Sequence, residues 1–194
     1  WKKDTLLLWM KVIVACIPGA VVTLLFDDYI EAHLHTPNVI AAALIVYGIA
    51  FILVENWNKT RRPRIRTLAD VDYSTALLIG MFQVLSIIPG TSRSGATIVG
   101  ALLIGVSRKA ASEFTFFLAV PVMAGASLLK ILKFGLAFSG AEMMILLVGM
   151  AVSFVVSVLV IKFLMNYIRK HDFKIFGWYR IVLGILVILF FTFR

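Results

Sequence analysis

Long apolar runs constrain the fold of this 194-residue chain more than any other feature. Residues 6–26, 39–54, 110–129 and 143–165 form such runs, and a shorter one covers residues 181–193. In a helix that rises about 1.5 Å per residue, roughly twenty apolar residues cross a membrane's hydrocarbon core. Hydrophobic residues make up 61% of the chain, whereas soluble domains hold roughly half. We therefore predict an all-α integral membrane protein with about five transmembrane helices.

A polar segment, residues 89–97, interrupts a further apolar region and reads Pro-Gly-Thr-Ser-Arg-Ser-Gly-Ala-Thr. Its flanks, residues 74–88 and 96–106, are each too short to span comfortably, so we predict two half-helices around a loop. The chain either passes straight through or dips into the membrane and returns, as a re-entrant pair. The re-entrant topology places more of the loop lysines and arginines on one side of the membrane than straight passage does, as the positive-inside rule favours. We predict a single membrane domain, residues 1–194, with its site region at residues 74–106.

The polar segment suits phosphate binding. Gly90 and Gly95 let the backbone turn sharply and approach a ligand closely. Arg93 offers a planar fork of donors that matches two phosphate oxygens, and a helix beginning near Ala96 would point its free N–H groups at the loop. Three hydroxyls add hydrogen-bonding groups: Ser92, Ser94 and Thr97. These residues predict an anion site; the alternative is a kinked helix in which Arg93 only snorkels.

The sequence also resembles a known family. Residues 89–95, with Gly-Val-Ser-Arg at 105–108 and Ala-Ser-Glu-Phe at 111–114, are similar to the second signature region of the undecaprenyl-pyrophosphate phosphatases, the bacitracin-resistance family. The resemblance implies a phosphatase of the bacterial plasma (inner) membrane that converts undecaprenyl pyrophosphate to undecaprenyl phosphate and inorganic phosphate. That reaction recycles the lipid carrier for peptidoglycan synthesis in the cell wall and gives bacitracin resistance.

The resemblance and the residue chemistry together assign the expected site. Arg93 is the expected clamp for phosphate charge, and Ser92 or Ser94 either bonds phosphate or supplies the attacking hydroxyl. Glu113 is expected to pair with Lys109 or Arg108 in the site or its scaffold. The expected substrate-binding residues are Gly90, Thr91, Gly95, Thr97, Arg108, Gln83 and Glu113.

The expected partners are the polyprenyl pyrophosphate and membrane lipids. The net charge of +9 does not indicate nucleic-acid binding, because the basic residues cluster between apolar runs, as membrane topology requires. Whether the chain forms a homodimer is open.

One departure from the family is large. Members carry an earlier glutamate-rich motif followed by Pro-x-Ser-Ser-x-Gly-His, in a half related to this one by an inverted repeat, and this chain lacks it. Because the chain begins at Trp1 without methionine, we interpret it as the C-terminal part of a longer protein. The other half is expected to supply a histidine and the carboxylates that hold a divalent cation, Mg²⁺ or Ca²⁺; no metal ligand is assigned here. Whether this chain alone is active is open.

Two other functions compete with hydrolysis. A transporter or flippase of phosphorylated polyprenyl lipid is the stronger alternative, because broken helices around a midplane anion site are typical of transporters. The other is a structural subunit whose helix breaks serve packing only. The residues of the motif do not separate binding from hydrolysis.

Overall fold

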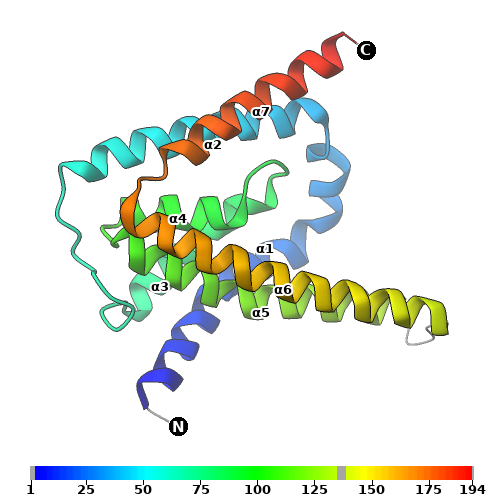
Figure 1. The fold of residues 1–194 in the computed structure, drawn as a ribbon, viewed down its shortest axis with the longest axis horizontal. Helices are drawn as coiled ribbons and strands as arrows, with labels where there is room; N and C mark the ends of the chain where they lie inside the picture. The colour runs from blue at the N-terminus through cyan, green and yellow to red at the C-terminus, as the bar shows by residue number, and fades with distance from the viewer. Residues whose placement is uncertain (1–2, 135–138, 194) are drawn as a thin grey trace.

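The computed structural model describes residues 3–134 and 139–193, and within these ranges it contains α-helices, short connections and no strand. The helices are α1 (Lys3–Leu34), α2 (Pro37–Lys59), α3 (Tyr73–Val84), α4 (Arg93–Leu103), α5 (Arg108–Phe134), α6 (Gly140–Lys170) and α7 (Lys174–Thr192), with a short 3₁₀ helix, η1 (Leu85–Ile87), after α3 (Figure 1). The predicted all-α fold is confirmed. The predicted domain also includes residues 1, 2, 135–138 and 194, which lie outside the described ranges.

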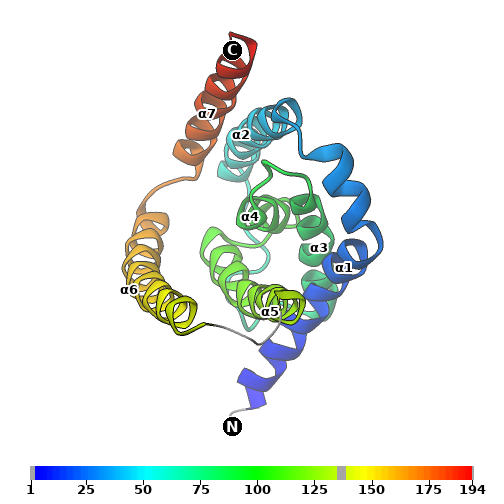
Figure 2. The same ribbon diagram turned by 90° about the vertical axis from the view of Figure 1, so that its right-hand side faces the viewer.

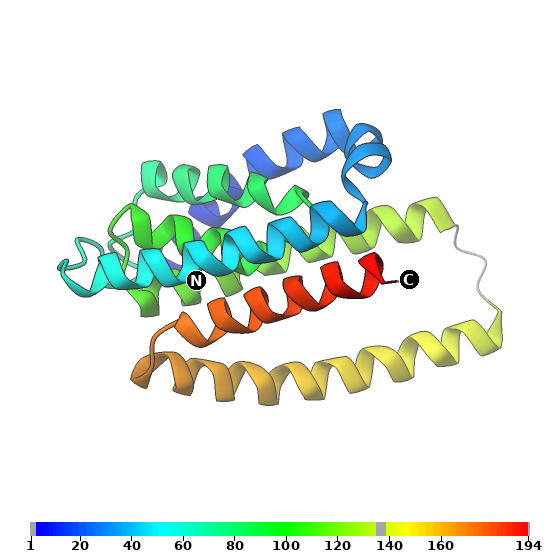
Figure 3. The same ribbon diagram turned by 90° about the horizontal axis from the view of Figure 1, so that it is seen from above.

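Five of the described helices are long and apolar enough to cross a membrane: α1, α2, α5, α6 and α7. These are the five spans that hydropathy predicts. Helices α2, α5, α6 and α7 are nearly parallel in the projection of Figure 3, whereas Figure 1 shows α7 inclined to α6. Their apolar side chains face outward over most of their length; the most apolar window of α6 has no buried residue. Such a surface is stable in lipid, so the chain is a multi-pass membrane protein.

Two predicted boundaries are wrong. Helix α1 continues beyond the apolar run that ends at residue 26 and reaches Leu34, because no proline or glycine occurs between residue 27 and Pro37. Pro37 then opens α2, where the Thr36 hydroxyl accepts a hydrogen bond from the Val39 N–H at 3.4 Å. Helix α7 begins at Lys174, not near residue 181, which places Arg180 inside the helix.

The two half-helices form a hairpin. Residues just before α3 pair with residues just after α4: the Arg64 N–H donates to the Gly105 carbonyl at 2.9 Å, and the Ser107 N–H donates to the Ile65 carbonyl at 2.8 Å. The chain therefore enters and leaves the hairpin at the same end, as predicted for a re-entrant pair (Figures 1 and 3). At its tip Gly90 has a φ of 89°, and a Cβ there would lie 2.5 Å from the Ile40 carbonyl of α2. Only glycine fits that turn.

Small residues let α2 and α7 approach closely. A Cβ added to Gly48 of α2 would lie 2.7 Å from the Gly177 carbonyl of α7, and one added to Gly177 would lie 2.7 Å from the Gly48 carbonyl. This is the close backbone contact that glycine permits between membrane helices. Most of helix α6, by contrast, stands apart from α2 and α4 (Figure 2), and its C-terminal end packs against both through Leu164 and Ile168.

We expect Gly48→Ala to destabilise the protein by about 1–3 kcal/mol, because its methyl group must push α7 away from α2. Gly149→Ala is the matched control, since a Cβ there meets nothing within 4 Å, and alanine favours the helix by about 1 kcal/mol over glycine. Thermal unfolding in detergent measures both variants. A melting temperature for Gly48→Ala equal to or above that of Gly149→Ala would contradict this packing.

Candidate functional site

The polar motif forms the beginning of α4. Ser92 is the N-cap, and its Oγ accepts a hydrogen bond from the Gly95 N–H at 3.1 Å. The helix therefore begins at Arg93, three residues before the predicted start at Ala96, because serine is a strong N-cap. The first N–H groups of α4 have no partner within the helix. Together with the helix dipole they favour an anion at this end.

A cavity of about 120 Å³ opens beside this helix start. Its polar surface comes from α4, α5 and α7, while aromatic and aliphatic side chains of α2, α4, α5, α6 and α7 form the rest. Ser92 and Ser94 share a hydrogen bond of 3.0 Å at its edge. The lining residues are Phe51, Ser92, Ser94, Gly95, Ile98, Ser112, Thr115, Phe116, Leu164, Ile168, Phe173, Phe176 and Arg180.

Arg180 supplies the positive charge of the cavity. It is half-buried, its Cζ lies 5.8 Å from the centroid of the Phe51 ring, and its Nη1 is buried without a hydrogen-bond partner among the described residues. This role of Arg180 was not identified from the sequence. The available signal was an arginine next to a strongly apolar run, which is typical of functional sites in membrane helices.

Arg93 lies on the other side of the motif. It is half-buried, is absent from the cavity lining, and is close enough to Cys16 of α1 to interact with it electrostatically. No carboxylate among the described residues pairs with Arg93. Gln83 faces the same helix, because a Cβ added to Gly19 of α1 would lie 3.1 Å from its Nε2. The Oε1 of Gln83 is buried with no partner in the described chain.

The other predicted residues are divided between the motif and its scaffold. Thr97 is fully buried, donates to the Arg93 carbonyl at 3.0 Å, and accepts a hydrogen bond from the cavity residue Thr115 at 3.1 Å. Gly90 and Thr91 belong to the turn before α4. Glu113 is partly exposed and lies 3.9 Å from Lys109, which was one of its two predicted partners.

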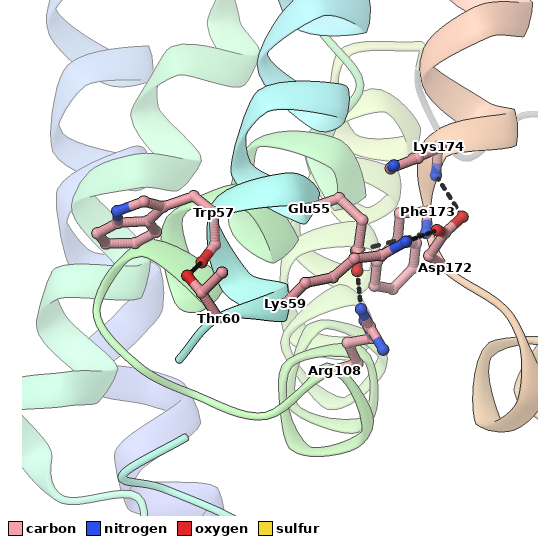
Figure 4. A network of polar contacts seen from close by, with 8 residues as sticks. All are labelled: Glu55, Trp57, Lys59, Thr60, Arg108, Asp172, Phe173 and Lys174. Atoms are coloured by element: carbon pink, nitrogen blue, oxygen red, sulfur yellow. Dashed lines mark hydrogen bonds and ion pairs between the residues drawn. The ribbon is translucent and has the colours of Figure 1, made fainter. Parts of the chain in front are cut away.

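Arg108 is paired with a carboxylate that was not identified from the sequence, that of Glu55. Its Nη2 donates to Oε1 of Glu55, a side chain with 0% exposure near the end of α2 (Figure 4). Arg108 is absent from the cavity lining. No sequence pattern points to this pair, because its members lie 53 positions apart on different helices.

The described residues do not form a metal centre. No group of three or more His, Cys, Asp or Glu residues lies close enough to hold an ion in residues 3–134 and 139–193. The cavity lining contains none of these four residue types. The predicted divalent cation therefore finds no ligand set in this part of the chain, and its requirement stays a prediction.

Comparison with known proteins gives a consistent assignment. The family model described as bacitracin resistance protein BacA matches residues 1–186. An undecaprenyl-diphosphatase of Enterococcus faecalis is 70% identical over 188 residues, which cover 97% of this chain and 68% of that protein. One from Desulfitobacterium hafniense is 59% identical over 194 residues, covering 100% of this chain and 70% of that protein. The chain belongs to the BacA family of bacitracin resistance proteins.

Proposed function

We propose that this protein hydrolyses undecaprenyl diphosphate to undecaprenyl phosphate and inorganic phosphate; its relatives are named undecaprenyl-diphosphatases. It is a membrane hydrolase, and the reaction recycles the lipid carrier of peptidoglycan synthesis. One observation carries the assignment of the site. The cavity joins an arginine that pairs with no carboxylate among the described residues, and a pair of hydroxyls, to a largely apolar wall. A prenyl diphosphate has the same two parts, an anionic head and a hydrocarbon tail.

In this proposal the diphosphate lies at the N-terminus of α4. Ser92 and Ser94 hydrogen-bond its oxygens, with Arg180 facing them across the cavity. Arg93, at the first residue of α4, clamps the phosphate charge from the other side with its planar fork of donors. Such donors stabilise the charge that develops on phosphate oxygens as the bond breaks, which is often the largest part of catalysis. Gly95 leaves room for the phosphate beside the helix backbone.

The apolar wall suits the lipid tail. The wall consists of the four phenylalanines of the lining together with Ile98, Leu164 and Ile168. Each buried methylene group of an isoprenoid contributes about 0.8 kcal/mol. Binding energy from the tail can therefore hold the diphosphate against the polar end.

The attacking group needs an activating base, and the cavity lining supplies none. We propose that the base and the divalent cation's ligands lie outside the residues described here. The chain's own residues then bind the diphosphate, orient it and stabilise its charge. We also propose that the protein lies in the bacterial plasma membrane and assembles as a homodimer. Bacitracin resistance of the host follows from the family assignment.

The test is the identity of the products formed from undecaprenyl diphosphate in detergent micelles. We expect one inorganic phosphate and one undecaprenyl phosphate per turnover, with activity lost when EDTA removes divalent cations. Release of inorganic diphosphate would contradict the proposal. Movement of the intact lipid between the leaflets of liposomes, without phosphate release, would favour a flippase.

A further inference from the structure

Glu55 connects three elements of the fold. It lies near the end of α2 and is fully buried. Its Oε1 accepts a hydrogen bond from Arg108 at the start of α5, and its Oε2 accepts one from the Phe173 backbone N–H at 3.4 Å (Figure 4). Phe173 is the last residue before α7. A single carboxylate therefore joins α2, α5 and the turn between α6 and α7.

A second ion pair anchors the same turn to the same end of α2. Lys59 Nζ lies 3.1 Å from Asp172 Oδ2, and the Lys174 N–H donates to Asp172 at 3.4 Å (Figure 4). Partial burial raises the pKa of Asp172, but hydrogen bonds from Lys59 and Lys174 and their charges outweigh burial and hold it below its usual range. Asp172 is therefore ionised at neutral pH and available to pair with Lys59.

The anchored turn carries one side of the cavity. Phe173 and Phe176 line it directly, and Arg180 follows on α7. Apolar packing supports the same turn, because Phe173 is buried in a cluster with Phe51 of α2 and Ile168 of α6. The carboxylate of Glu55 adds a directional polar contact between α2 and this turn, which the apolar packing of Phe173 alone does not supply.

We propose that Glu55 is a positioning residue of the active site: it holds the start of α7, and hence Phe173, Phe176 and Arg180, against the Ser92–Ser94 motif. Arg108 acts through Glu55 by compensating its buried charge, and it does not contact the substrate. This inference rests on the proposed function. It replaces the substrate-binding role that the sequence suggested for Arg108.

Two double variants separate these roles. Glu55→Gln with Arg108→Gln removes both charges but keeps an oxygen at position 55 that accepts from the Phe173 N–H. Glu55→Met with Arg108→Met removes the charges and that acceptor. Arg108→Met alone leaves a buried carboxylate uncompensated, which is strongly unfavourable. Glu142→Gln, an exposed carboxylate at the N-terminus of α6, is the matched control, since glutamine also suits its capping position.

We expect kcat/KM for undecaprenyl diphosphate to fall at least about tenfold in Arg108→Met, because one partner of a buried pair is lost. The double glutamine variant should recover most of this loss, the double methionine variant should stay low, and Glu142→Gln should match the wild type. If both double variants are equally low, Arg108 contacts the substrate itself and the inference is overturned.

A coupling measurement tests whether Glu55 acts through α7. Arg180→Met should cost much less activity in the double methionine background than in the wild type, because residues that act as a unit give non-additive losses. A merely structural role for Glu55 leaves the two losses equal. Equal losses would overturn the inference.

Hydrogen exchange gives a readout that does not depend on turnover. Backbone amides of residues 172–177 should exchange faster in the double methionine variant than in the double glutamine variant, because only the latter keeps the acceptor for Phe173. Unchanged exchange overturns the inference even if the enzyme is active. If the wild type releases no phosphate but hydrogen exchange follows this pattern, the proposed function is wrong, whereas the role of Glu55 in holding the start of α7 is supported.

Discussion

Replacing Arg93 by alanine is expected to lower kcat/KM at least about 100-fold, which corresponds to about 3 kcal/mol of transition-state stabilisation lost with one preorganised donor group. Arg93 stands at the first residue of α4, between the two serines, and no described carboxylate neutralises it. Its fork is thus available for phosphate oxygens. The helix cap is Ser92, so the substitution leaves the start of α4 intact. Steady-state phosphate release measures the effect.

Two further variants show what the Arg93 side chain contributes. Arg93→Lys keeps the positive charge but loses the planar fork, so its activity should fall between those of the wild type and the alanine variant. Arg62→Ala removes an exposed arginine from the loop before α3 and should retain full activity. Near-normal turnover of Arg93→Ala would remove Arg93 from the site.

Replacing Arg180 by methionine is expected to change activity and stability in opposite directions. Activity should fall by about 100-fold, because the cavity that contains the serine pair loses its cation. Stability should stay the same or rise, because Nη1 is buried without a hydrogen-bond partner in the described chain and such a group costs about 1–3 kcal/mol. Methionine keeps a long apolar stem near Phe51. A residue that lowers stability while serving the reaction is typical of active sites.

Phosphate release and thermal unfolding of Arg180→Met, measured in the same detergent, test both parts of this prediction. Lower activity with an equal or higher melting temperature supports a functional arginine. A lower melting temperature with unchanged activity per folded molecule would show that Arg180 is a packing residue of α7.

Much of the fold follows from hydropathy. The five spans are long apolar runs, and lipid requires such runs to be helical because every backbone group must be bonded within the segment. The hairpin of α3 and α4 could also be expected, since neither arm reaches across the membrane alone. Boundaries were less certain because they depend on local caps. Ser92 starts α4 three residues early, and α1 continues past residue 27 because nothing interrupts it.

The site was only partly accessible from the sequence. The motif residues are contiguous and carry unusual chemistry for an apolar region, so Ser92, Arg93 and Ser94 stood out. Arg180 and Glu55 did not, because each lies at the end of an apolar run where a charged residue usually marks the membrane interface. Their roles depend on tertiary structure: Arg180 lines the same cavity as the motif because α7 packs on α2, and Glu55 pairs with Arg108 of another helix.

The most direct test of the central claim measures phosphate release from undecaprenyl diphosphate by the longest natural form of the protein. It compares the wild type with a variant that combines Arg93→Ala and Arg180→Met. The account predicts metal-dependent release by the wild type and a loss of at least about 1,000-fold in the combined variant, since both donors act on the same charge. Folding of the variant is checked by its melting temperature. A folded combined variant that turns over like the wild type would place the reaction elsewhere and contradict the account.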